Sequence, residues 1–255
     1  MTPERRPWLL PREHGAYAQL GCPLVAALLS GRPSGVAALL ATATVAAFVA
    51  HEPLLVLLGH RGARLRRESR PWRWLAASGG LALAAGLLGL VLAEPTVRWA
   101  TLAPAVLGGV SFAVLLRGSE RSSLGETLAA AALASAAVPV AMACGVAPLR
   151  AASAWIVWAA GLAACTAAVR WLIARHKGRP EPSSFVILVS VTALVISGTV
   201  TVDAGLAAVL PLFAAAWTLV VVKPHPRDLR TVGWSLVASS LASLGLLVRV
   251  AHLAG

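Results

Sequence analysis

The segment His51-Glu52-Pro53 places two titratable side chains and a proline inside a long apolar stretch of the chain. On insertion scales, an ionised side chain inside a membrane segment costs roughly 2.5 to 3.5 kcal/mol unless it faces protein or water. Pro53 has no N–H and its ring clashes with the carbonyl of Val49, so it bends a helix and leaves one backbone acceptor available. The three residues therefore predict a site at one depth of the second apolar stretch.

A second group of ionisable residues, Arg12-Glu13-His14, precedes the first apolar stretch. If the chain turns back near Arg32, His51 lies about 18 residues, or roughly 27 Å, from that turn, and the same distance leads back to this group. We therefore expect Glu52 to be neutralised by Arg12 or to share a proton with His14. Such a cluster serves equally well to fasten two helices together, so the sequence leaves a pocket and a structural role open.

Basic residues at the end of the sixth apolar stretch predict an anion site. Arg170, Arg175 and Lys177 fall there, and Glu126 at the start of the fifth stretch either orients Arg170 or acts as a helix-dipole partner. A phosphate or carboxylate headgroup would be held between the second and sixth stretches. No metal or other cofactor is predicted, because His51 and Glu52 point about 100° apart on a helix and no His-x-x-x-His spacing supports them.

The composition indicates how these residues are positioned. Apolar residues make up 58% of the chain and charged residues 13%, which is typical of a polytopic membrane protein. Runs long enough to cross about 30 Å of hydrocarbon recur along its whole length. The sequence therefore predicts an all-α transmembrane bundle of about nine helices, forming one integral membrane domain over residues 1–255. The predicted crossings are 14–31, 35–59, 74–93, 97–116, 124–146, 151–174, 184–201, 203–221 and 230–251.

The basic residues predict the orientation of this bundle. Of the 22 Lys and Arg residues, all fall in one set of alternate connections except Arg32, Arg98, Arg150 and Arg249. Because Lys and Arg concentrate in cytoplasmic connections, the N-terminus is predicted in the cytoplasm and the C-terminus outside a bacterial inner membrane. The net charge of +12 then indicates membrane lipids as partners and excludes nucleic acid.

Two resemblances follow from these motifs. The segment Pro11-Arg12-Glu13-His14-Gly15-Ala16-Tyr17, followed by His51-Glu52-Pro53, resembles the YwiC-like family of bacterial integral membrane proteins. More remotely, the helix count and the loops after the second and sixth helices resemble the UbiA superfamily of membrane prenyltransferases. That resemblance implies aspartate-rich motifs that hold magnesium and a prenyl diphosphate, whereas the segments here read HEPLLVLLGHRG and AVRWLIARHKG. Only Glu52 stands in for any of those carboxylates, so no catalytic residue carries over.

The leading hypothesis is that the protein binds or processes an amphipathic isoprenoid or quinone-like molecule. Its tail would occupy a cytoplasm-facing cavity between the first, second, fifth and sixth helices. A UbiA-like prenyltransferase with degenerate metal motifs, a small-anion or proton-coupled carrier that uses Glu52 and His51, and a purely structural membrane partner remain as alternatives. Enzymatic activity and oligomeric state are left open. The candidate ligand-binding residues are Arg12, Glu13, His14, His51, Glu52, Glu126, Arg170 and Arg175.

Overall fold

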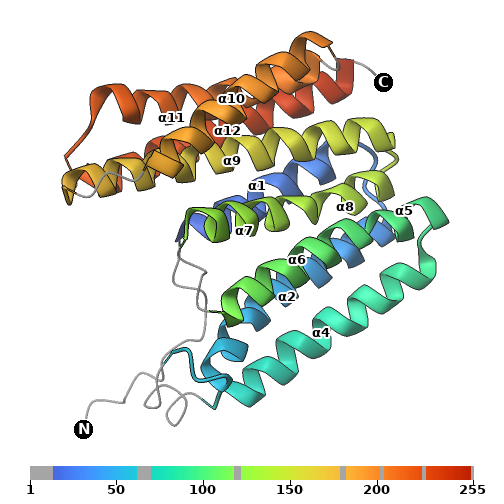
Figure 1. The fold of residues 1–255 in the computed structure, drawn as a ribbon. Coiled ribbons are helices and arrows are strands. Elements are labelled where there is room, and N and C mark those ends of the chain that lie inside the picture. The colour runs from blue at the N-terminus through green and yellow to red at the C-terminus, as the bar shows by residue number, and fades with distance from the viewer. Residues whose placement is uncertain are drawn as a thin grey trace, which may run out of the picture.

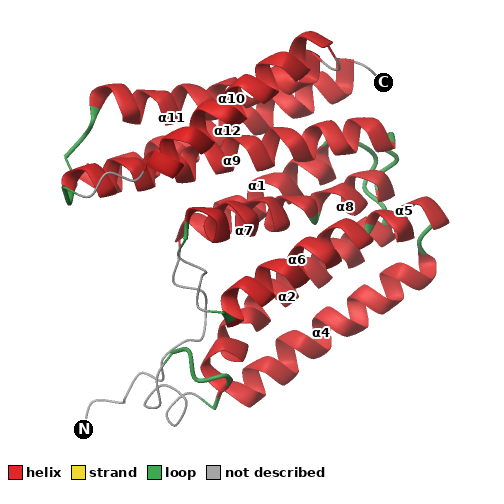
Figure 2. Ribbon diagram, viewed as in Figure 1, coloured by secondary structure: helices red, strands yellow, loops and turns green. Residues whose placement is uncertain are grey.

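The computed structural model describes residues 14–61, 70–117, 122–178, 182–201, 204–225 and 228–253, and these contain helices and no strand. Figures 1 and 2 show the helices lying side by side as roughly parallel rods. The elements are α1 His14–Leu29, α2 Gly35–Leu57, α4 Pro71–Leu92, α5 Pro95–Ala100, α6 Leu102–Leu116, α7 Ser123–Ser135, α8 Ala137–Ala143, α9 Pro148–His176, α10 Pro182–Thr201, the 3-10 helix η1 Ala204–Val209, α11 Leu210–Val222 and α12 Leu229–Leu253.

Eight helical segments of the described chain are long and apolar enough to cross a membrane, and α1 adds a shorter apolar helix, Ala16–Leu29. Taken in order, these segments coincide with the nine predicted crossings, which confirms the all-α transmembrane bundle. The long segments are Gly35–Leu57, Pro71–Leu92, Pro95–Leu116, Ser123–Ala143, Pro148–His176, Pro182–Thr199, Gly205–Val222 and Arg230–Leu253.

Three of the predicted crossings are interrupted, each shortly before a proline. α5 gives way to α6 ahead of Pro104, α7 to α8 ahead of Pro139, and η1 to α11 ahead of Pro211. A proline cannot donate to the carbonyl four residues back, so the regular hydrogen-bond ladder stops there. In contrast, α2 continues through Pro53, which is fully buried.

Small residues determine which helices pack closely. α2 packs most extensively against α4, where Gly89 lies against Leu40 and Gly86 against Ala43. α9 packs against α7, α10 and α11, and a Cβ on its Gly161 would collide with Leu212 of α11. In Figure 1, α2, α4 and α6 therefore lie on one side and α9 to α12 on the other, with α1, α7 and α8 between them.

The hairpin between α1 and α2 is fixed at one end of the bundle. Ser34 caps α2 by accepting from the Ala37 N–H, and its hydroxyl donates to the Ala143 carbonyl at 2.7 Å. The Arg32 N–H donates to the Cys144 carbonyl at 2.8 Å. These bonds hold α1 and α2 against the end of α8 and set the depth of the residues that follow.

Candidate functional site

Glu52 lies near the end of α2 and is only 5% exposed. The Arg61 Nη2 donates to its Oε2 at 3.1 Å, and the Nε lies 3.0 Å from its Oε1 as a charge contact without hydrogen-bond alignment. Leaving a buried carboxylate without a counter-charge is strongly destabilising, so Arg61 explains how Glu52 is tolerated. From the sequence, Arg61 is only one of the many basic residues that indicate membrane topology, and its pairing with Glu52 is not predicted.

An aromatic contact joins α1 to α2 close to the two predicted ionisable groups. Tyr17 of α1 packs edge-on against Phe48 of α2, with ring centroids 5.4 Å apart. Because the helices run in opposite directions, His14, one turn before Tyr17, lies at the depth of His51, one turn after Phe48. His51 is partly buried there. Arg12 and Glu13 lie outside the described residues, so the neutralisation of Glu52 by Arg12 stays a prediction, as does the proton shared with His14.

A second polar group joins the start of α7 to the end of α9. The Arg170 Nη1 lies 3.0 Å from the Glu126 Oε1, and its Nε donates to the Ser123 Oγ at 3.0 Å. The Ser123 hydroxyl also lies 3.2 Å from the Ser184 hydroxyl of α10. Ser122 starts α7 by accepting from the Gly125 N–H, which places Ser123 and Glu126 in the first helical turns. Glu126 thus contacts Arg170, the first of the two roles that the sequence allows it.

This polar group borders a cavity of about 1380 Å³ between α1, α7, α9, α11 and α12. Arg170, Lys177 and Arg230 are its basic lining residues, and Glu126 is the one carboxylate among the described lining residues. From Leu162 to Lys177 the cavity follows α9 for about 22 Å, from the interior to the helix end. Most of its wall is apolar, including Leu162, Val169, Ile173, Leu212, Leu236 and Val237.

The helices that line this cavity differ in part from the predicted ones. α1, α7 and α9 line the cavity, as the first, fifth and sixth predicted helices, but α2 does not, and α11 and α12 take its place. The physical reason is the packing of the helices. α2 packs against the face of α4 that carries Gly86 and Gly89, whereas α12 packs against α1 and α11. Glu52 and His51 therefore do not line this cavity with Arg170.

Arg175 of α9 and Arg230 of α12 differ in their position relative to the cavity. Arg175 stacks its guanidinium 5.4 Å from the ring centre of Trp171 and does not line the cavity. Arg230 does line it, together with Trp234 one turn later. Arg230 is not among the predicted site residues, although a basic and an aromatic residue four positions apart at the start of an apolar run share one face of a helix and indicate such a site.

The cavity combines net positive charge at one end with an apolar interior. Such a site favours a molecule with an anionic head and a hydrocarbon tail. Among the described residues, no group of three or more His, Cys, Asp or Glu side chains is placed to hold a metal ion. The described lining of the cavity provides cationic side chains that can meet an anion.

A bundle of helices long and apolar enough to cross a lipid bilayer defines a polytopic integral membrane protein. Residues 10–142, just over half of the chain, match the family model described as YwiC-like protein, and the chain belongs to that family. The matched part contains His51-Glu52-Pro53 and Glu126, and it ends in α8, before Arg170. No curated protein and no solved structure matches the chain, and the remote resemblance to UbiA enzymes stays a prediction.

Proposed function

We propose that the protein binds an amphipathic isoprenoid or quinone-like molecule with an anionic headgroup, in the cavity between α9 and α12. The observation that supports this proposal best is that the cavity is basic at one end and apolar along the rest of its length. Arg170, Lys177 and Arg230 line it near the end of α9 and the start of α12, and an apolar wall follows. The headgroup contacts these three cations, and the tail lies along Leu162, Leu212 and their neighbours.

The electrostatic balance of the site supports an anion over a neutral head. Three cations face one carboxylate among the described lining residues. Arg170 is only 20% exposed in its side chain, and the ion pair with Glu126 holds it in place. Hydrogen bonds to charged groups contribute about 1.5 to 3 kcal/mol each when well formed, and those to the exposed Lys177 and Arg230 contribute less.

The position of the cavity supports uptake from within the membrane. The basic residues lie at the helix ends that the charge distribution assigns to the cytoplasmic face of a bacterial inner membrane. Arginine and lysine side chains at this level reach headgroups while their stems cover apolar surface. The isoprenoid class of the tail rests on the UbiA resemblance, and a fatty acid or phospholipid is the competing occupant that the experiment separates.

The test is saturation binding of radiolabelled geranylgeranyl phosphate to the purified protein in detergent, with geranylgeraniol, oleate and a phosphatidic acid as competitors. We expect the phosphate to bind and the alcohol to compete at least about tenfold less well, because it lacks the charge-assisted bonds. Equal competition by the alcohol contradicts an anionic head. Stronger competition by oleate or phosphatidic acid contradicts the isoprenoid tail.

Matched variants localise the binding. Lys177→Gln and Arg230→Gln each remove one exposed charge from the cavity lining and should weaken binding by about threefold to tenfold. Arg117→Gln is the control, because Arg117 is an exposed basic residue at the end of α6 that does not line the cavity. Losses of the same size in all three variants would contradict the assignment of the headgroup to this cavity.

A further inference from the structure

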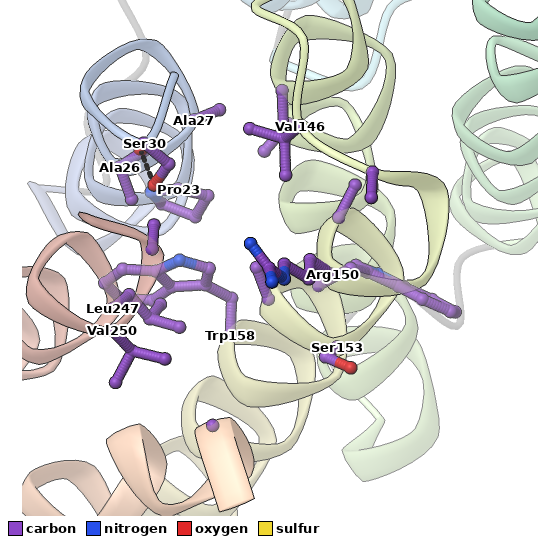
Figure 3. Close-up of a pocket in the computed structure, with 18 of the residues that line it drawn as sticks. Pro23, Ala26, Ala27, Ser30, Val146, Arg150, Ser153, Trp158, Leu247 and Val250 are labelled. Carbon is purple, nitrogen blue, oxygen red and sulfur yellow. Dashed lines mark hydrogen bonds between the residues drawn. The ribbon is translucent and has the colours of Figure 1, made fainter. Parts of the chain in front are cut away.

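A second cavity lies near the opposite end of α1, α9 and α12, the three helices that it shares with the first cavity. It has a volume of about 540 Å³ and is lined by α1, α8, α9, η1 and α12. Figure 3 shows the Arg150 side chain directed into this space, with Trp158, Leu247 and Val250 along its wall. Its lining is otherwise largely apolar, so it has the same character as the first cavity: a basic residue at a helix end and hydrocarbon beyond it.

The two cavities follow the same seam and nearly meet. On α1, Gln19 lines the first cavity and Pro23 the second; on α9, Leu162 lines the first and Trp158 the second. Each of these pairs is four residues apart, which is about 6 Å along one face of a helix. On α12, Ser240 and Leu247 are about 10 Å apart. The layer that separates the cavities is therefore only one to two helical turns thick.

Two buried polar groups without partners lie in this layer and at its border with the second cavity. The Trp158 indole N–H and the Ser243 hydroxyl have no hydrogen-bond partner among the described residues, and these residues are 1% and 0% exposed. Ser243 lies between Ser240 and Leu247 on the same face of α12. Leaving a buried donor unsatisfied destabilises the folded protein, so two of them in an apolar region indicate a role beyond packing.

We propose that the two cavities are the two ends of one passage, and that the protein carries the anionic head of its amphipathic ligand from one membrane face to the other. This inference rests on the proposed function for the identity of the ligand. Arg170, Lys177 and Arg230 receive the headgroup at one face, and Arg150 receives it at the other. In the layer between, Trp158 and Ser243 donate hydrogen bonds to the head as it crosses.

The length of α9 supports two opposite openings. Arg150 and Lys177 lie about 40 Å apart along this helix, which exceeds the roughly 30 Å of hydrocarbon in a bilayer. Trp158, Leu162 and Leu247 belong to one buried apolar cluster that closes the passage in this structure. A headgroup therefore needs this cluster to open, and the two polar donors then offset part of its lost hydration.

The test uses phosphatidylcholine vesicles that contain the protein and geranylgeranyl phosphate labelled with ³²P in both leaflets. A phosphatase added outside releases phosphate from the outer leaflet alone unless headgroups cross. We expect vesicles with the protein to lose nearly all of the label and vesicles without it to retain the inner half. Retention of the inner half by both, with binding of the same probe intact, overturns the passage and leaves the proposed function standing. Absence of binding overturns both.

Two small substitutions test the route. Ser243→Ala and Trp158→Phe remove the unpartnered donors and should each slow release from the inner leaflet at least about fivefold, since each removes a hydrogen bond to the charged head. Binding of the probe should stay unchanged. Ser239→Ala is the control, because that exposed hydroxyl already donates to the Ser235 carbonyl at 2.9 Å. Unchanged release in both variants, or an equal loss in the control, overturns the route through this layer.

Discussion

Replacing Glu126 by Gln should strengthen the binding of an anionic amphipath. Glu126 holds Arg170 at 3.0 Å, but it also places a negative charge in a cavity that we propose for an anion. Gln has nearly the same shape and keeps a hydrogen-bond acceptor, while it removes the repulsion. A proton-coupled or cation-binding site would show the opposite, because it would lose its carboxylate.

The size of the effect follows from the geometry of the ion pair. A headgroup that contacts Arg170 from the cavity would lie about 6 Å from the Glu126 carboxylate, where two unit charges repel by about 1.4 to 2.8 kcal/mol at an effective dielectric constant of 20 to 40. The Glu126 side chain is 37% exposed, so water and salt reduce this value. We expect binding to be about threefold to tenfold tighter.

The assay is saturation binding of geranylgeranyl phosphate to purified protein in detergent, at low salt and at physiological salt. The gain should shrink at the higher salt concentration, because screening weakens the repulsion that the substitution removes. Glu94→Gln is the control, since Glu94 is an exposed carboxylate at the N-cap of α5 and lines neither cavity. Weaker or unchanged binding by Glu126→Gln would refute the placement of the head beside Arg170.

Four further outcomes are expected. Arg61→Met leaves the buried Glu52 carboxylate without its counter-charge and should lower the free energy of unfolding by about 1 to 3 kcal/mol. Glu52→Gln should lower the melting temperature less than Arg61→Met does. A larger loss in Glu52→Gln would contradict the pairing. Gly161→Ala should destabilise the protein by about 1 to 3 kcal/mol, because the added methyl group collides with Leu212 of α11. Gly108→Ala should not, because open space surrounds Gly108. Equal melting points of these two variants would contradict this packing. Reporter fusions after Arg73 should signal cytoplasm and fusions at the C-terminus the outside, and inverted signals would overturn the topology. A prenyl diphosphate offered with aromatic acceptors should give no magnesium-dependent product, because Glu52 alone cannot hold the metal ions; such a product, lost in Glu52→Gln, would reverse this conclusion.

The number and order of the helices could be predicted because long apolar runs separated by basic connections are a local property of the sequence. The shared depth of His51 and His14 stays a prediction, which follows from the position of one turn and the rise of a helix. The breaks before Pro104, Pro139 and Pro211 were open to the same reasoning, but Pro53 leaves α2 continuous. Local sequence patterns therefore predict the helices better than they predict where a helix is broken.

The arrangement of the helices could not be predicted in the same way. The sequence placed the anion site between the second and sixth helices, yet α2 packs on the glycine face of α4 and α9 faces α12 across the cavity. Which apolar faces meet depends on the fit of small and large residues far apart in the chain, such as Gly161 and Leu212. The spacing of Arg230 and Trp234 could be read from the sequence, but the cavity that they line could not, because its other walls come from α1, α7, α9 and α11.

Photo-crosslinking tests the central claim most directly. A geranylgeranyl phosphate analogue with a benzophenone at the end of its tail is bound to the purified protein and irradiated, and the labelled peptides are identified by mass spectrometry. A head at Arg170 and Lys177 places the tail along the interior of the cavity, so the label should appear on α9 around Leu162 and on α12 around Ser240. Unlabelled geranylgeranyl phosphate should suppress it. A suppressible label on α2 and α4 beside Glu52, with none on α9 or α12, would contradict the account.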